Sequence, residues 1–200
     1  IGDLARALDR YRSTSTEAAR QRWVRSGLAD IGASLQRADT LADFAQRLFT
    51  PLMPMFGGGA AALYLCDTDA CTFCGGWGVQ EQALGERRFV LGEGLLGQAA
   101  RDAQPRVIHD LPAGYLLLAS GLGEKEPGVL VLVPLKDADL VVGILELALF
   151  SAPDDTQWAL VQELSEAATP RLMVLQRTLH TQDLLAETQR QAHTLQLQTD

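Results

Sequence analysis

Two apolar segments near the middle of the chain constrain its fold most strongly. Residues 129–135 and 140–150 are almost entirely apolar, and only the four residues 136–139 separate them. A connection this short suits a β-hairpin, whereas parallel strands need a long crossover, usually a helix. Because the apolar character does not alternate, both faces of these strands are expected to be covered. The sequence therefore predicts a buried antiparallel pair at the centre of a sheet.

A glycine motif upstream suggests a different fold, which this hairpin excludes. Gly92, Gly94 and Gly97 spell G-x-G-x-x-G between a short apolar run and a helical pattern, and Asp110 follows at roughly the position of a ribose-binding acid. That arrangement is typical of dinucleotide-binding folds. However, Glu93 would place a negative charge where the pyrophosphate must bind. The antiparallel hairpin also contradicts a parallel sheet, so we reject this interpretation.

The remaining pattern predicts short strands around one helix. Further strands are expected at residues 60–66, 71–79, 87–90 and 106–109. A short helix is expected over residues 95–102. The connection over residues 110–128 is long and rich in glycine and proline, and loops of this length inside a domain tend to be functional.

Three segments, taken in order, resemble the GAF domain family. They are Leu-Gly-Glu-Gly-Leu-Leu-Gly-Gln at 91–98, Val-Ile-His-Asp-Leu-Pro at 107–112 and Val-Gly-Ile-Leu-Glu-Leu at 142–147. The similarity is greatest to the GAF domains of bacterial HAMP-containing sensor histidine kinases and related receptors. The resemblance implies an α+β fold with an antiparallel sheet of about six strands, flanking helices and long terminal signalling helices. It also implies a small-molecule pocket or its remnant, and a signalling role.

We divide the chain into three parts on this basis. Residues 1–30 are expected to form an N-terminal signalling helix, residues 31–175 the GAF-like sensor domain, and residues 176–200 a C-terminal coiled-coil linker helix. The opening residues 1–8 resemble the second helix of a HAMP linker, which implies a cytoplasmic domain within a membrane-anchored receptor. No apolar run is long enough to span a bilayer, so no membrane contact is expected in this fragment.

Both terminal helices carry apolar residues at three- and four-residue steps without a partner inside the same helix. A parallel homodimer would supply that partner. The expected dimer seam consists of Leu4, Leu8, Tyr11, Val161, Leu164, Ala168, Leu172, Leu175 and Leu179. Pro170 lies inside the C-terminal helical pattern, where it removes a backbone hydrogen bond, so we expect a kink there.

The three cysteines, Cys66, Cys71 and Cys74, allow more than one interpretation. An odd number does not indicate a disulfide scaffold, and a reducing cytosolic setting is the simpler inference. Cys71 and Cys74 could form a redox pair or hold a metal. Neighbours on a strand alternate between faces, however, so these two side chains are expected to point in opposite directions. We therefore favour buried thiols and expect no metal or other cofactor.

The candidate ligand pocket combines apolar side chains with a few polar groups, as small-molecule sites generally do. Its expected lining residues are Tyr64, Phe73, Trp77, Phe89, Leu96, Tyr115, Leu118, Ser120 and Glu146. Glu146 interrupts an apolar strand and must find a partner or take up a proton. We favour an ion pair with Arg88 or Arg106. In the alternative, Glu146 lines the pocket and accepts hydrogen bonds from a ligand.

Other function classes are disfavoured. The net charge of −8 argues against nucleic acid as a partner, because phosphate contacts need clustered Lys and Arg. The chain lacks the N-K-x-F-D-E run of cyclic-nucleotide-binding relatives and the Cys-His pair of bilin-binding relatives. We see no nucleophile with a base and no carboxylate pair, so catalysis is not expected.

These observations predict a sensory GAF domain that relays a signal between N- and C-terminal helices in a dimeric two-component-type receptor with an output domain in the same chain. Binding of a small molecule is the expected input. Two alternatives remain: a ligand-free structural relay and dimerisation module, or a thiol or metal redox sensor built on the three cysteines.

Overall fold

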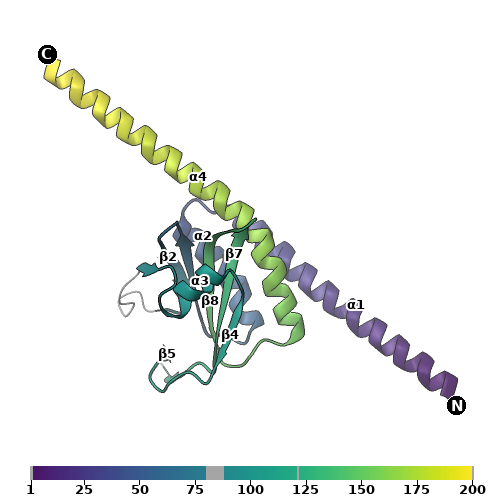
Figure 1. Ribbon diagram of the computed structural model, residues 1–200. Coiled ribbons are helices and arrows are strands. Elements are labelled where there is room, and N and C mark those ends of the chain that lie inside the picture. Colours follow the sequence, from purple (N-terminus) through teal and green to yellow (C-terminus); the bar gives the residue numbers. More distant parts are fainter. Residues whose placement is uncertain (1, 80–87, 121, 200) are drawn as a thin grey trace.

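The computed structural model describes residues 2–79, 88–120 and 122–199, and it contains two long terminal helices around a compact α+β domain. Helix α1 spans Gly2–Leu35, α2 spans Leu41–Met55 and α4 spans Asp155–Thr199. Figure 1 shows the two chain ends at opposite extremes of the molecule, with the domain between them. Both α1 and α4 pass without a break through the boundaries expected at residues 30 and 175.

The N-terminal region contains two helices, α1 and α2. The chain leaves its helical path after Leu35 and begins a new helix at Leu41, with Thr40 as the N-cap. The Thr40 hydroxyl accepts a hydrogen bond from the Asp43 N–H at 3.1 Å, which satisfies a backbone donor that the first turn leaves unpaired. Pro51 and Pro54 lie inside the last turns of α2.

The sheet is antiparallel throughout its recorded pairings and has six strands in the order β3-β2-β1-β8-β7-β4. Its strands are β1 Ala60–Cys66, β2 Ala70–Trp77, β3 Arg88–Val90, β4 Arg106–His109, β7 Val129–Asp137 and β8 Leu140–Leu149. The expected central hairpin is confirmed as β7 and β8, and its turn places Ala138 at a φ of 52°. Helix α3 spans Gly94–Asp102, and a small separate hairpin pairs β5 Leu118–Ser120 with β6 Gly123–Lys125 inside the long connection.

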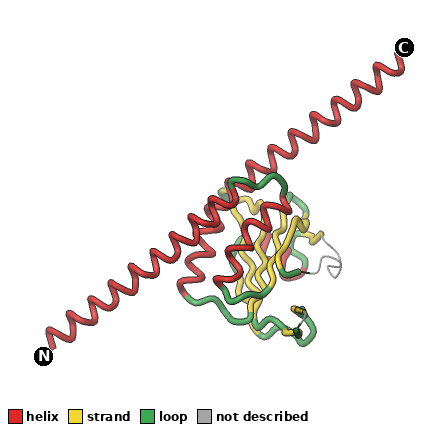
Figure 2. The backbone as a smooth tube through the Cα atoms, turned by 180° about the vertical axis from the view of Figure 1, so that it is seen from behind, coloured by secondary structure: helices red, strands yellow, loops and turns green. Residues whose placement is uncertain are grey.

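Each face of the sheet is covered by a different layer. On β8, Leu145 and Leu147 face a core built with α1, α2 and α4, whereas Ile144 and Ala148 face a second core that includes residues of α3. Figure 2 shows the large helices in front of the strands, and Figure 1 shows α3 on the opposite side. Coverage of both faces explains why β7 and β8 are apolar without alternation.

The glycine motif forms the turn between β3 and α3. The Gly92 N–H donates to the Gly97 carbonyl oxygen at 2.7 Å, and Gly92 and Gly94 have φ values of 87° and 63°. A Cβ on Gly97 would lie 2.1 Å from the Val90 carbonyl oxygen. The motif therefore serves a tight strand-to-helix turn in an antiparallel fold, where glycine is required by backbone geometry and close approach.

Helix α4 begins with a capping box and bends further along. The Asp154 carboxylate accepts hydrogen bonds from the N–H groups of Thr156 and Gln157 at 2.9 and 2.8 Å. Figure 1 shows that α4 changes direction between the part beside the domain and the outgoing part. Pro170 lies inside this helix, and the Thr169 hydroxyl donates to the Ser165 carbonyl oxygen at 2.7 Å. A proline and a threonine back-bonded in this way both bend helices, in agreement with the predicted kink.

The first part of α4 packs on its own sheet, which corrects part of the expected dimer seam. The side chains of Val161, Leu164, Ala168 and Leu172 are buried in the core of the protomer, so a second copy cannot reach them. Their spacing matches a coiled-coil seam because packing on a sheet and packing on a partner helix require the same apolar stripe.

The other seam residues have different surroundings. Leu175 and Leu179 are half-buried, and Tyr11 is 73% exposed. The side chains of Leu4 and Leu8 lie outside the described part of the structure. Among the described helices, none has both the length and the apolar composition needed to cross a bilayer.

Candidate functional site

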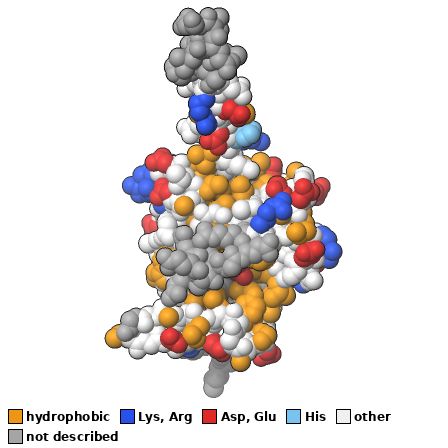
Figure 3. All heavy atoms as spheres, turned by 90° about the vertical axis from the view of Figure 1, so that its left-hand side faces the viewer, with side chains coloured by type: hydrophobic (Ala, Val, Ile, Leu, Met, Phe, Trp, Pro, Cys, Tyr) orange, Lys and Arg blue, Asp and Glu red, His pale blue; other side chains and the backbone are white. Residues whose placement is uncertain are grey.

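A cavity of about 410 Å³ lies on the face of the sheet opposite to the long helices. Strands β1 and β8 form its floor, while α3 and the long connection form its sides. Its lining residues are Ala60, Ala61, Ala62, Tyr64, Val79, Phe89, Gly94, Leu95, Leu96, Tyr115, Leu116, Leu130, Glu146 and Ala148. Figure 3 views the molecule from the edge of the sheet at which β2 lies and shows hydrophobic side chains at the surface around the residues that are not described. Cavities of this size with mostly apolar walls accommodate small molecules.

Glu146 and Tyr64 form the polar part of the cavity. The Tyr64 hydroxyl donates to Oε2 of Glu146 at 2.8 Å, and the two residues lie on neighbouring strands β1 and β8. Burial raises the pKa of the Glu146 carboxyl above its ordinary value of 4.5, and this hydrogen bond offsets only part of the effect. Burial and the nearby Glu146 carboxylate raise the pKa values of both Tyr64 and Tyr115.

The expected ion pair of Glu146 is not present. Within the described ranges no Lys or Arg pairs with the Glu146 carboxylate; Arg106 pairs with Asp102 instead, and Arg88 lies on the edge strand β3. The alternative interpretation, in which Glu146 faces the pocket, describes its surroundings correctly.

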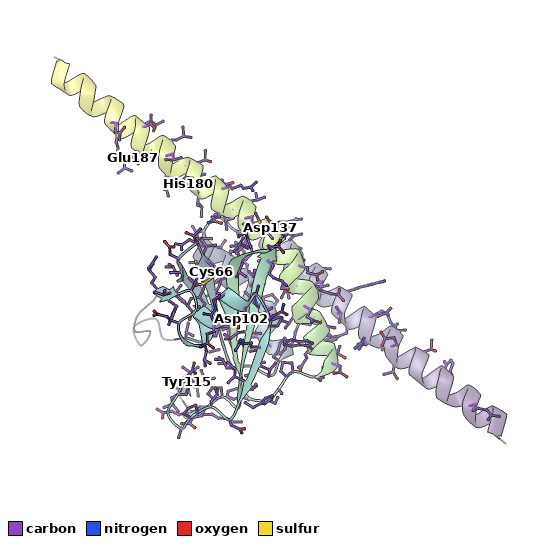
Figure 4. All side chains as sticks on the ribbon, in the orientation of Figure 1. Cys66, Asp102, Tyr115, Asp137, His180 and Glu187 are labelled. Carbon is purple, nitrogen blue, oxygen red and sulfur yellow. A yellow bond between two sulfur atoms is a disulfide. The ribbon has the colours of Figure 1, made fainter. Side chains whose placement is uncertain are left out.

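The structure brings together part of the predicted pocket. Tyr64, Phe89, Leu96, Tyr115 and Glu146 all line the cavity. Figure 4 shows Tyr115, on the long connection, toward the end of the domain that lies away from Cys66. Because these residues come from β1, β3, α3, β8 and this connection, only the tertiary fold could unite them.

Four other predicted lining residues lie elsewhere. Phe73 packs edge-on against the Tyr64 ring, with centroids 5.8 Å apart, and Leu118 packs at the margin of the same core. Trp77 packs toward the long helices on the other face of the sheet, because strand residues alternate between faces. Ser120 is exposed on β5, where its hydroxyl donates to the Gly123 carbonyl oxygen at 3.3 Å.

Sequence reasoning missed the residues that create the empty space. Ala60, Ala62 and Ala148 line the cavity from β1 and β8, and their short side chains leave room above the sheet. The run of three alanines from Ala60 to Ala62 is a visible signal, since a strand that begins with small residues cannot fill the layer above it.

The cysteines correct the expectation of three free thiols. Cys66 and Cys71 form a disulfide across the β1–β2 hairpin, where they face each other in register. The sequence argument relied on the odd count, whereas direct opposition of two strand positions brings the sulfur atoms together. Figure 4 shows Cys66 toward the end of the domain from which the outgoing part of α4 leaves.

Cys74 is the remaining cysteine and lies apart from the disulfide. It packs with the helix-side core, whereas Cys66 and Cys71 belong to the cavity-side core, so the prediction of opposite directions for Cys71 and Cys74 is confirmed. Burial raises the pKa of the Cys74 thiol. No group of three or more metal-ligating side chains occurs in the described ranges.

The fold and the cavity together define a class of domain: an antiparallel sheet with long helices on one face and a small-molecule pocket on the other. The GAF domain family model matches residues 38–170, and the chain belongs to the GAF domain family. No curated protein matches the chain.

Solved structures show the same fold at low sequence identity. The GAF domain of a phosphoenolpyruvate-protein phosphotransferase from Coxiella burnetii is 18% identical, with a TM-score of 0.64 over 78% of this chain and 95% of that chain. Free methionine-R-sulfoxide reductase from Neisseria meningitidis, in complex with its substrate, is 21% identical, with a TM-score of 0.59 over 78% and 91% of the two chains. The GAF domain of A. aeolicus nlh2 in an inactive state is 14% identical, with a TM-score of 0.60 over 78% and 98%.

Proposed function

We propose that this chain is a sensory module without catalytic activity of its own, in which occupancy of the cavity alters the packing of the helices that enter and leave the domain. In this proposal the chain acts as a homodimer on the cytoplasmic side of a membrane-anchored, two-component-type receptor with an output domain. GAF domains generally serve signalling, which supports the broad role. The finer context rests on the resemblance of the sequence to HAMP-containing sensor kinases.

One observation carries the relay: a single layer of strands separates the cavity from the signalling helices. Tyr64 and Glu146 face the cavity, while Leu63 and Leu145, their neighbours on the same strands, face the core formed with α1, α2 and α4. A shift of either strand therefore acts on both layers at once, because close-packed interiors transmit displacement.

The two long helices are also joined to each other beside the sheet. The Arg171 guanidinium of α4 donates to the Gly32 carbonyl oxygen of α1. A Cβ on Gly27 of α1 would lie 2.9 Å from Cε of Met55 and 3.3 Å from Cδ1 of Leu160, so α1 packs tightly against α2 and α4. Movement of α4 on the sheet should therefore reach α1.

The outgoing part of α4 supplies a surface for a second copy. Val174, Thr178, Thr181, Leu185 and Thr188 follow a 3.5-residue repeat, and Val174 and Leu185 are 63% and 58% exposed. The three threonine hydroxyls donate to the carbonyl oxygens four residues earlier at 2.8 to 2.9 Å. Because these hydroxyls are already bonded, a partner helix can cover the stripe without leaving them unsatisfied.

Light scattering tests the dimer. We expect twice the chain mass for the native protein and the single chain mass for a Val174→Gln/Leu185→Gln variant. Leu184→Gln is the matched control, because it removes the same kind of apolar side chain from an exposed position beside the stripe. A native protein that remains monomeric at high concentration would refute the dimeric relay.

Distance measurements between protomers test the relay itself. A spin label at Thr188→Cys, in a Cys74→Ser background, reports the separation of the two α4 helices. Ala148→Leu fills the cavity from its floor and serves as a substitute for a ligand, and Gly123→Ala on β6 is the control. We expect Ala148→Leu to change the distribution of inter-helix distances and Gly123→Ala to leave it unchanged. Identical distributions in a folded Ala148→Leu protein would contradict coupling.

A redox response is a second candidate, favoured by the disulfide beside the cavity core. Disulfides rarely persist in a reducing cytosol. In the cytosol Cys66 and Cys71 would therefore be mostly reduced, and formation of their disulfide under oxidising conditions would be the signal.

A further inference from the structure

The charge distribution of the cavity limits the chemistry of a ligand. Glu146 is the acidic group on its wall, and no described lining residue is Lys, Arg or His. The rest of the lining is apolar apart from glycine and the hydroxyls of Tyr64 and Tyr115. Among the described residues this carboxylate has no positive partner, and separation of a charge from both water and a counter-ion is costly.

The Glu146 carboxylate can accept further hydrogen bonds from a molecule in the cavity. Tyr64 donates to Oε2, and no further partner of this carboxylate is recorded within the described ranges. The described structure contains no buried side-chain oxygen that lacks a partner, so Oε1 retains accessible surface. Because Glu146 lines the cavity, we take this surface to face the empty space. An ionised carboxylate can accept several hydrogen bonds, so a donor from a ligand fits here.

The aromatic residues of the wall favour a positive charge over a neutral donor. Tyr64, Phe89 and Tyr115 surround the same space as Glu146, and the Tyr64 and Phe89 rings pack edge-on with centroids 5.5 Å apart. Ring faces attract organic cations, and a carboxylate within an aromatic wall is a recurrent way to hold an ammonium group. The net charge of −8 also favours cations over anions in the approach to the domain.

We infer that the cavity binds an organic monocation, namely an amine with a flat apolar body, whose ammonium group pairs with Glu146 while its body lies against the apolar walls on β1, α3 and the long connection. This inference rests on the proposed sensory function and specifies its input. The cavity of about 410 Å³ limits the ligand to a small molecule of roughly the bulk of one or two aromatic rings.

A matched series of indole compounds tests the charge preference by calorimetric titration of the full 200-residue chain at neutral pH. Tryptamine carries the cation, tryptophol is its neutral counterpart and indole-3-acetate is an anionic counterpart. We expect tryptamine to bind about 10- to 100-fold more tightly than tryptophol, the range that a charge-assisted hydrogen bond supplies. Indole-3-acetate should bind most weakly.

Two variants assign the preference to Glu146. Glu146→Gln keeps the shape and can still accept from Tyr64, so it should bind tryptamine and tryptophol equally. Glu187→Gln, which removes one exposed carboxylate from the outgoing part of α4, should leave the native preference unchanged. Retained binding of tryptophol shows that the Glu146→Gln cavity is intact.

Several outcomes would overturn the inference. Equal binding of tryptamine and tryptophol to the native protein, tightest binding of indole-3-acetate, or an unchanged preference in Glu146→Gln would each show that the cation is not recognised by this carboxylate. Failure of all three compounds at millimolar concentration would also reject it. Failure of the sensory function is a separate result, since it would appear as a monomeric chain or as unchanged inter-helix distances.

Discussion

At the scale of single residues, Glu146 is the position where the sequence departs from what its strand requires. Its neighbours on β8, Leu145 and Leu147, are buried and apolar, as a central strand demands. Among the described residues Tyr64 is its one hydrogen-bond donor, and the side chain also lines the cavity. A polar group that opposes the local pattern and gains little from the fold is typically retained for binding or catalysis.

The raised pKa of Glu146 predicts a specific pH dependence of stability. The folded state holds this proton more tightly than the unfolded chain, whose carboxyl has the ordinary pKa of 4.5. The contribution to the free energy of unfolding is therefore constant below that pKa and falls as pH rises toward the raised folded-state pKa. Glu146→Gln cannot titrate and should lack this part of the fall. Urea unfolding from acid to neutral pH measures the difference, and parallel curves for the two proteins would contradict it.

At the scale of elements, a glycine turn and a disulfide fix the positions of strands and a helix on the cavity side of the domain. The glycine turn at residues 92–97 sets α3 close to the end of β3, and the Cys66–Cys71 disulfide joins β1 to β2 at their hairpin. Both restrain the elements that border the cavity.

Gly97 should tolerate no side chain, because a Cβ there would lie 2.1 Å from the Val90 carbonyl oxygen. We expect Gly97→Ala to lower the free energy of unfolding by about 2 kcal/mol or more, within the upper range of single substitutions. Gly123→Ala is the matched control: its Cβ meets nothing within 4 Å. A loss of unfolded-state entropy should make that variant neutral or slightly more stable. Equal effects of the two substitutions in urea unfolding would show that the close approach is not required.

The disulfide should contribute to stability through the short loop that it closes. Five residues of sequence separation correspond to about 2 kcal/mol in the chain-entropy treatment. A reductant should therefore destabilise the native protein and Cys74→Ser alike, but not Cys71→Ser. Under non-reducing denaturing conditions, thiol titration should find one free thiol per chain, that of Cys74. Three titrating thiols would show that the Cys66–Cys71 disulfide does not form.

At the scale of the whole molecule, α4 has two functions along one continuous helix. Its first part completes the core over the sheet, and its outgoing part leaves the domain with an exposed apolar stripe. The incoming helix α1 passes the same sheet and contacts α4. The cavity thus lies one strand layer away from both connections to the rest of the receptor that we propose.

Two leucines of α4 distinguish these functions. Leu172 is fully buried, so Leu172→Ala should reduce the free energy of unfolding by about 2–5 kcal/mol. Leu185 is exposed, so Leu185→Ala should change the stability of the protomer by no more than about 0.5 kcal/mol while weakening dimerisation. Thermal unfolding combined with light scattering measures both effects. Dilution to concentrations at which the chain is monomeric removes the effect of dimerisation. A large loss of stability for Leu185→Ala under those conditions would contradict the assignment of Leu185 to the dimer surface.

The sequence alone was sufficient where the signal is local. Apolar runs and turn residues predicted β1, β4 and the central hairpin, because strand patterns depend on neighbours in the chain. The order and spacing of three motifs also identified the family. Within the site, Tyr64 and Glu146 were recognised because each is a polar or aromatic group in an otherwise apolar strand.

Tertiary structure decided what depends on contacts between distant segments. It showed that Val161, Leu164, Ala168 and Leu172 pack on the sheet of their own protomer and not on a second copy of the chain. The sequence could not decide this, because the same apolar stripe suits either surface. The fold brought Cys66 and Cys71 into register, and it excluded Trp77 and Ser120 from the cavity. It also revealed that Ala60, Ala62 and Ala148 create the space, because a cavity is defined by side-chain volume that is missing between elements, which no single segment encodes.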